Sequence, residues 1–161
     1  MRKDSVRTVC GAIETGALGW CQIHEHVFVH DTPAAQKNPA LRIDDPEKSL
    51  AELKAYHACG GMSLCDAQPV AAGRDCEMLR QLSEQSGVSI VASTGYHLPI
   101  FYDADCWVCS LEEEALYDLY CEELTLGMLP HSAEPDIRPQ HRSDIRAGII
   151  KAAIGADGPV G

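Results

Sequence analysis

The chain has 161 residues, of which 45% are hydrophobic and 23% charged, values typical of a single folded domain of ordinary size. Its net charge is −11, from 24 acidic and 13 basic side chains, so it lacks the excess of cations on which nucleic-acid binding depends. No apolar run approaches the roughly 18 residues of a membrane span, and no apolar stretch follows Met1 as it would in a secretory signal. We therefore expect a soluble, cytoplasmic protein that binds neither nucleic acid nor membrane.

The first elements are a small hairpin and a strand. Residues 6–13 and 18–20 flank a glycine-containing turn, which predicts the hairpin. Residues 21–29 then alternate as a strand does, so His24 and His26 share one face of it.

Helices and strands alternate along the rest of the chain. Asp45 and Pro46 are typical of a helix start, as the cap and the first helical position, and Gly87 is typical of a helix end. Ser110, with Glu113 three residues later, predicts a capping box. The expected helices cover 46–58, about 75–86 and 111–126, and the expected strands cover 62–66, 88–94 and 147–152.

This alternation favours a parallel α/β sheet with right-handed crossovers. Two architectures fit the pattern: a small open sheet, or half of an eight-stranded barrel, since a full barrel takes about 250 residues. The glycine-rich motifs that hold phosphates are absent from the sequence, which argues against a nucleotide-binding open sheet.

The sequence His24-Glu25-His26 is the strongest chemical signal. Residues two apart on a strand point the same way, so both imidazoles can reach one metal ion, while Glu25 points to the other face. Histidine nitrogen suits zinc, manganese, iron, cobalt or nickel. Two ordinary histidines at the end of a strand would give the same spacing, so the spacing alone does not decide.

Lys151 lies in an otherwise apolar strand. Such a lysine must reach solvent, pair with an acid, or have a pKa low enough to be neutral. A neutral amine can react with carbon dioxide to form a carbamate, an anionic ligand that can bridge two metals. The pattern by itself favours a lysine that extends to solvent.

Other polar side chains follow the ends of strands. Asp66 could support a metal-bound histidine, or it could cap the next turn. Arg74 and Asp75 could form an ion pair within their loop. Tyr96 and His97 follow the third barrel-type strand, where a barrel places substrate contacts. The other histidines look like surface residues: His30, His57, His131 and His141.

There are eight cysteines. With no export signal, free thiols in a reducing cytosol are expected rather than disulfides. Cys106 and Cys109 form a CxxC motif, but a zinc site would want a second pair, and none exists. A redox pair would precede a helix, as this one does; incidental thiols are nevertheless the favoured interpretation.

Several strings, taken in order, resemble the phosphotriesterase family of the amidohydrolase superfamily. They are residues 6–9, Gly11, Ile13, Leu18-Gly19, His24-Glu25-His26, Asp66, Gly73-Arg74-Asp75, Gly87-Val88, Ile90-Val91-Ala92, Thr94-Gly95 and 145–151. Together they span nearly the whole chain, and their order and spacing are specific. Residues 93–97, with Phe101 and Tyr102, look closer to the uncharacterised bacterial phosphotriesterase-related proteins than to the organophosphate-degrading enzymes.

The resemblance implies the N-terminal half of a TIM (β/α)8 barrel, with about four β/α units after a short hairpin. It implies a two-metal centre in which His24 and His26 bind the more buried metal and Lys151 is the carboxylated, bridging ligand. For Lys151, this replaces the interpretation of a side chain that extends to solvent. The metals would be zinc, with manganese, cobalt or iron as alternatives. A bridging hydroxide would attack a phosphoryl or carbonyl group, and Tyr96 and His97 would lie in the substrate loop.

The family takes further ligands from later strands: two histidines from strands five and six, and an aspartate from strand eight. This chain ends after the fourth strand, so residues 1–161 are expected to form an incomplete metal-dependent hydrolase domain. It would be a truncated gene product, a deliberately shortened piece, or one half of a two-chain assembly.

Three hypotheses follow. The first is a metallohydrolase acting on small lactone or phosphotriester substrates. The second is a non-catalytic half-barrel that must self-associate or meet a missing C-terminal half to be stable. The third, the weakest, is a thiol-based metal or redox protein that uses Cys106 and Cys109.

Overall fold

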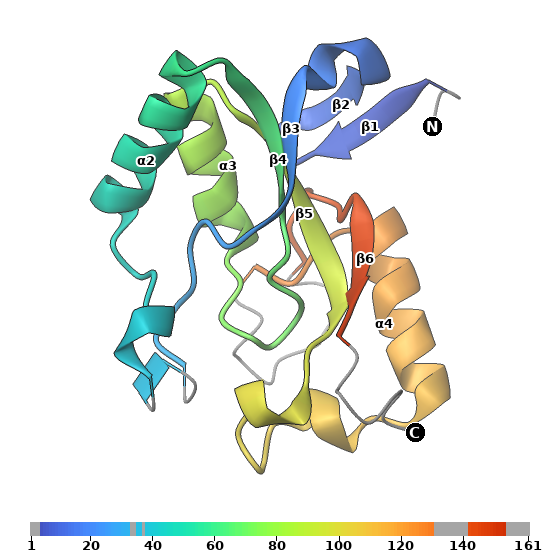
Figure 1. Ribbon diagram of the computed structural model, residues 1–161. Coiled ribbons are helices and arrows are strands. Elements are labelled where there is room, and N and C mark those ends of the chain that lie inside the picture. The colour runs from blue at the N-terminus through green and yellow to red at the C-terminus, as the bar shows by residue number, and fades with distance from the viewer. Residues whose placement is uncertain (1–3, 33–34, 37, 131–141, 154–161) are drawn as a thin grey trace.

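A four-stranded parallel sheet forms the centre of the computed structural model, which describes residues 4–32, 35–36, 38–130 and 142–153 (Figure 1). The strands lie in the order β3 (Trp20–Glu25), β4 (Gly61–Asp66), β5 (Ser89–Tyr96) and β6 (Ile149–Ala152). Every neighbouring pair is parallel. Chain order and sheet order therefore coincide, as they do around a barrel.

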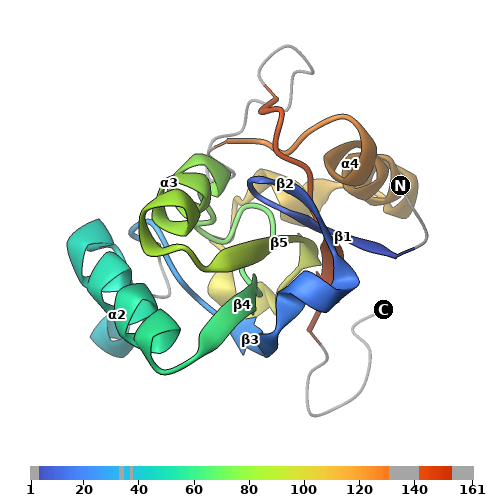
Figure 2. The same cartoon turned by 90° about the horizontal axis from the view of Figure 1, so that it is seen from above.

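The helices lie around one side of the curled sheet, as the view from above shows (Figure 2). They are α2 (Pro46–Ala58), α3 (Cys76–Ser86) and α4 (Glu113–Thr125). A doubly wound open sheet would carry helices on both faces, whereas a barrel carries them on the outside only. The expected N-terminal half of a TIM barrel is confirmed.

The main core lies between α2, α3 and the helix-facing side of the sheet. Leu53 from α2 and Leu79 from α3 pack against strand residues such as Leu64 and Ile90. All four are almost fully buried. Burying a side chain of this size stabilises the fold by roughly 1.5–3 kcal/mol.

The predicted ends of α2 and α3 are confirmed. The Asp45 carboxylate accepts the backbone N–H groups of Glu47 and Lys48, both at 3.1 Å. Asp75 caps α3 in the same way. Gly87 closes α3 in a left-handed conformation, with φ of 79°, which glycine adopts without steric cost.

The hairpin is confirmed, but its predicted second arm is wrong. β1 (Ser5–Thr8) pairs with β2 (Gly11–Glu14), so both arms and the turn lie within 5–14. Gly11 has a φ of 112°, and the Thr8 hydroxyl donates to its carbonyl at 2.8 Å. The chain therefore turns earlier than predicted. Leu18 ends the 3-10 helix η1 (Thr15–Leu18), and Trp20 begins β3. The backbone N–H of Val9 donates to the Ile90 carbonyl of β5 at 2.8 Å.

The predicted capping box at Ser110 is also wrong. Ser110 closes a short 3-10 helix, η4 (Trp107–Ser110), and its hydroxyl donates to the Trp107 carbonyl at 2.7 Å. That bond occupies the side chain that would have capped α4. Helix α4 begins at Glu113 with no side-chain cap.

The strand predicted over 21–29 is shorter than expected. β3 ends at Glu25 after a register shift against β4. Residues 27–29 are buried but belong to a loop, in which Val29 bridges to Ile43. The 3-10 helix η2 (Pro39–Leu41) lies in the same connection, and η3 (Pro99–Phe101) follows β5.

Arg74 forms a buried ion pair that the sequence does not predict. Its guanidinium binds both carboxylate oxygens of Glu123 on α4, at 2.6 and 2.8 Å, with both side chains fully buried. The Asp75 carboxylate accepts the backbone N–H groups of Glu77 and Met78, and it lies 2.9 Å from His30 Nε2. Arg74 also donates to the carbonyls of Ser93 and Leu129, so it ties the loop after β4 to β5 and α4.

None of the helices within the described ranges is both long and apolar enough to cross a membrane.

Candidate metal centre

His24 and His26 lie side by side at the carboxyl end of β3. Their ring centroids are 5.4 Å apart, with the rings inclined at 67°. His24 is the last residue but one of the strand, and His26 follows the strand directly. Glu25 lies between them and accepts a hydrogen bond from the Gln22 side-chain amide. The imidazoles are thus neighbours, as their spacing predicts.

Lys151 reaches the same region from β6. It pairs with Gly95 of β5, and its side chain is half-buried. Burial lowers the pKa of the Lys151 amine, against a weaker opposing effect of Asp66. Burial also lowers the pKa of His26, and the charges of Lys151 and His24 lower it further. The structure therefore gathers His24, His26 and Lys151 at one end of the sheet.

His97 joins this group from the loop after β5. Burial lowers the pKa of His97 to about 4, with further contributions from Lys151, His26 and His24. The Nδ1 atom of His97 accepts the backbone N–H of Leu98 at 2.8 Å. In the neutral ring the proton is then on Nε2, so His97 is a hydrogen-bond donor at this site.

Tyr96 points elsewhere. Its hydroxyl donates to Cys109 Sγ at 3.2 Å, and its ring packs on Tyr102 at 5.0 Å between centroids. The Tyr102 hydroxyl accepts the backbone N–H of His97 at 2.8 Å. Tyr102 therefore fixes the loop that carries His97, a role that its place in the sequence did not suggest.

The residues present fit part of a metal coordination shell. The Nδ1 atom of His26 is buried and has no hydrogen-bond partner, as expected of a nitrogen that serves as a ligand. Imidazole and a partly desolvated amine suit a divalent transition metal. Within the described ranges, no three His, Cys, Asp or Glu side chains converge on a point, so the sheet offers two imidazoles and one amine rather than a closed cage.

The loop after β4 supports the residues around His26. The fully buried Asp66 carboxylate accepts the backbone N–H of Val27 at 2.8 Å and that of Gln68 at 3.0 Å. Of the two interpretations of Asp66, its bond with the Gln68 N–H directly supports the turn cap. Burial raises the pKa of Asp66 to about 6, although its backbone donors and Arg74 lower it. Gln68, which the sequence did not single out, interacts through its side chain with His26.

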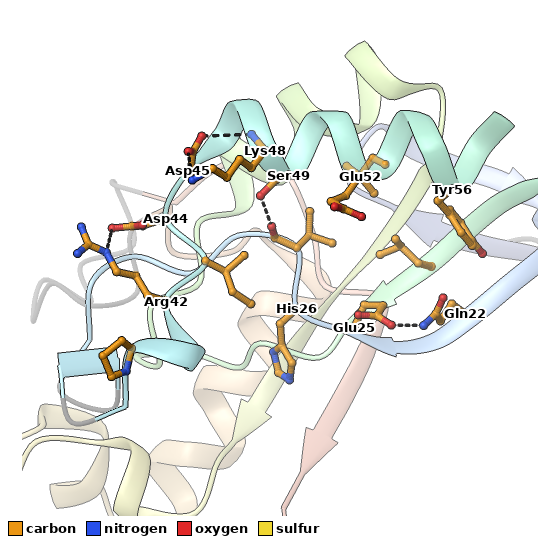
Figure 3. A pocket seen from close by; sticks show the side chains of 15 residues that line it. Gln22, Glu25, His26, Arg42, Asp44, Asp45, Lys48, Ser49, Glu52 and Tyr56 are labelled. Carbon is orange, nitrogen blue, oxygen red and sulfur yellow. Dashed lines mark hydrogen bonds and ion pairs between the residues drawn. The ribbon is translucent and has the colours of Figure 1, made fainter. Parts of the chain in front are cut away.

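Two cavities border His26. The larger, about 820 Å³, runs between the end of β3 and α2 (Figure 3). Figure 3 shows Lys48, Glu52 and Tyr56 of α2 on one side of it and Glu25 and His26 on the other. The smaller, about 160 Å³, lies against His26, Gln68, His97 and Phe101. His97 and Gln68 are its polar groups nearest the imidazoles.

The other histidines and the CxxC motif lie outside this group. His30 is half-buried rather than on the surface and binds Asp75. His57 is exposed on α2 and contacts the Gly61 carbonyl at 3.0 Å. His131 and His141 lie outside the described residues. Cys106 and Cys109 are free thiols.

These features define a class of protein: one half of an α/β barrel with imidazole and amine side chains gathered at the carboxyl ends of its strands. Residues 4–159 match the model of the phosphotriesterase family. The chain belongs to the phosphotriesterase family.

Individual relatives agree. The chain is 30% identical to an uncharacterised protein of Mycoplasma pneumoniae and 29% identical to a phospho-furanose lactonase of Mycoplasmopsis agalactiae. Its fold matches an amidohydrolase from Mycoplasma synoviae with a TM-score of 0.84 at 26% identity. It matches an organophosphorus hydrolase from Deinococcus radiodurans with a TM-score of 0.69 at 28% identity.

Each match covers nearly all of this chain but less than half of the relative. The matches cover 95% and 96% of this chain but 44% of each sequence relative. For the two structures they cover 97% and 94% of this chain but 45% and 44% of the other. The chain therefore spans less than half the length of the relatives it matches.

Proposed function

We propose that residues 1–161 supply the first four barrel strands, with the helices between them, of a metal-dependent hydrolase domain that cleaves the ester bond of a lactone or a phosphotriester. The observation that carries this proposal is the group at the carboxyl end of the sheet: two adjacent imidazoles, one with a buried nitrogen that has no hydrogen-bond partner, beside the half-buried Lys151 amine. The phospho-furanose lactonase and the organophosphorus hydrolase among the relatives support an ester substrate.

His24, His26 and Lys151 would hold a divalent metal, with zinc the first candidate and manganese, cobalt or iron the alternatives. Such a metal supplies a Lewis acid for the carbonyl or phosphoryl group and a source of nucleophile at neutral pH. Lys151 would bind as the carbamate: its neutral amine adds to carbon dioxide and releases one proton. Burial favours that reaction because it lowers the pKa of the amine.

His97 would contact the substrate, and Tyr96, also expected there from the sequence, would support it. The Nε2–H of His97 is a donor suited to a carbonyl or phosphoryl oxygen, and the adjoining 160 Å³ cavity can hold a small group. The Tyr96 hydroxyl donates to Cys109 and its ring packs on Tyr102, so Tyr96 would act by holding the loop that carries His97.

A second candidate is a non-catalytic half-barrel that must associate to be stable. Trp20 and Ile23, on the edge strand β3, are 83% and 80% exposed. Large apolar side chains on a free sheet edge favour pairing with another chain. The two candidates are compatible if association completes the metal site.

Zinc binding to the purified full chain tests the proposal. Calorimetry on chain with its accessible thiols alkylated should show one zinc bound, with affinity falling at least about 100-fold in His26→Ala, more than for a change outside the ligand shell. His57→Ala, on the exposed face of α2, is the matched control and should bind as the original chain does. Unchanged zinc affinity in His24→Ala and His26→Ala would refute the proposal.

A further inference from the structure

We propose that Asp66 is a positioning residue for His26: from the neighbouring strand, it fixes the backbone on which that imidazole is carried. The inference rests on the proposed function for the role of His26, but its geometry stands independently of any metal.

The backbone on both sides of His26 is fastened to the segment that follows β4. Before His26, the Glu25 carbonyl accepts the N–H of Ala67 at 2.7 Å. After it, the Val27 N–H donates to Asp66 Oδ2 at 2.8 Å. His26 therefore lies between two bonds that cross to the adjacent strand, at the point where regular β3–β4 pairing has ended.

The second oxygen of Asp66 acts on the side chain of His26 through Gln68. Asp66 Oδ1 accepts the Gln68 backbone N–H at 3.0 Å. The Gln68 side chain interacts with His26, and its amide nitrogen also donates to the Ala72 carbonyl. One carboxylate thus orders both the backbone after His26 and the residue beside its ring.

A carboxylate suits this place better than an amide. Asp66 is fully buried, so each N–H that it accepts would otherwise lack a partner, at a cost of about 1–3 kcal/mol. Both oxygens accept. An asparagine has one accepting oxygen, so Asp66→Asn keeps the shape but loses one of the two bonds.

Asp75 provides a matched control. It too is a buried carboxylate that accepts two backbone N–H groups, from Glu77 and Met78, each at 3.0 Å, but both bonds go to its Oδ1, while its Oδ2 lies 2.9 Å from His30. Those bonds stay within the first turn of α3, whereas the bond from Val27 to Asp66 spans 39 residues. Asp75→Asn can keep both of these bonds through its one accepting oxygen but loses the carboxylate oxygen beside His30, so it should lower stability without moving His26.

The test compares Asp66→Asn and Asp75→Asn in the full chain. We expect both to lower the melting temperature. Only Asp66→Asn should change the His24 and His26 ring signals in proton–nitrogen NMR spectra and lower zinc affinity about 10-fold. Unchanged ring signals in a folded Asp66→Asn chain, or equal changes in both variants, would overturn the inference.

Amide exchange in the unsubstituted chain gives a measurement that does not depend on a variant folding. The Val27 N–H should exchange at least about 100-fold more slowly than its free-peptide rate, because it is buried and bonded to Asp66. Exchange at the free-peptide rate would overturn the inference. If the original chain binds no zinc while Val27 is protected and the ring signals respond to Asp66→Asn, the proposed function fails and the positioning role stands.

Discussion

At the residue scale, the Arg74–Glu123 pair joins parts of the chain that are 49 residues apart. Both side chains are fully buried, and the guanidinium binds both carboxylate oxygens. Removing one partner of such a pair leaves an uncompensated buried charge, which costs about 3–5 kcal/mol. We predict that Glu123→Gln lowers the free energy of unfolding by this amount in urea titrations. Lys48→Gln, at the exposed pair with Asp45, should change it by less than about 1 kcal/mol.

The same pair predicts a pH dependence. Burial alone would raise the pKa of Glu123, but Arg74 and the backbone N–H of Leu129 hold it below its usual 4.5. The ionised form is therefore favoured in the fold. Its contribution is complete above pH 4.5 and is lost as pH falls through the lower folded pKa. Urea unfolding from pH 7 down to 3 should show this loss in the original chain and a smaller loss in Glu123→Gln; parallel profiles would contradict it.

How far residues could be predicted depends on how local their partners are. The neighbouring imidazoles follow from strand alternation at His24 and His26. Lys151 needed the family resemblance, because a single lysine in an apolar strand has several explanations. The partner of Arg74 could not be predicted, because the pairing depends on how α4 packs. Gln68 carries no motif, and only the three-dimensional arrangement places it beside His26.

At the scale of elements, Gly95 of β5 pairs with Lys151 of β6. A Cβ at Gly95 would lie 1.9 Å from the Lys151 carbonyl oxygen, and its φ is 113°. We predict that Gly95→Ala costs about 3 kcal/mol through overpacking and backbone strain, and weakens zinc binding by displacing Lys151. Gly87→Ala is the control: its Cβ would meet only His57 at 3.6 Å, so it should cost about 1 kcal/mol and leave zinc affinity unchanged. Equal effects on zinc would contradict the account.

Element boundaries were predictable where capping chemistry is local. The start of α2 follows from Asp45 and Pro46. The start of α3 follows from Asp75, and its end follows from Gly87. The capping box predicted at Ser110 does not form, because the Ser110 hydroxyl donates to the Trp107 carbonyl and does not cap α4. The end of β3 was misplaced because its apolar residues after Glu25 are buried in a loop, and burial alone does not distinguish a loop from a strand.

At the scale of the whole molecule, β3 and β6 are the edge strands of the sheet that the described residues form. The exposed Trp20 and Ile23 lie on the first of them. We predict that the chain dimerises or aggregates, and that Ile23→Lys reduces the association seen by light scattering, because a charge on an edge strand opposes pairing. Gln85→Lys, which adds one positive charge at an exposed position of α3 just as Ile23→Lys does on β3, is the charge-matched control. A monodisperse monomer with a sharp cooperative melt would contradict the half-barrel account of its behaviour in solution.

The isolated chain should have little or no hydrolase activity. The described sheet offers His24, His26 and Lys151, and the chain covers only 44% of the lactonase it resembles. We therefore expect negligible turnover of lactones and phosphotriesters with added zinc or manganese. Robust turnover that His24→Ala abolishes would show that these four strands suffice.

The most direct test of the central claim is to locate zinc in crystals of the full chain by anomalous scattering. The account predicts an ion within about 2.0–2.1 Å of an imidazole nitrogen of both His24 and His26, with the Lys151 side chain directed towards it. An ion found only at Cys106 and Cys109, or crystals grown in zinc with no ion between the two imidazoles, would contradict it.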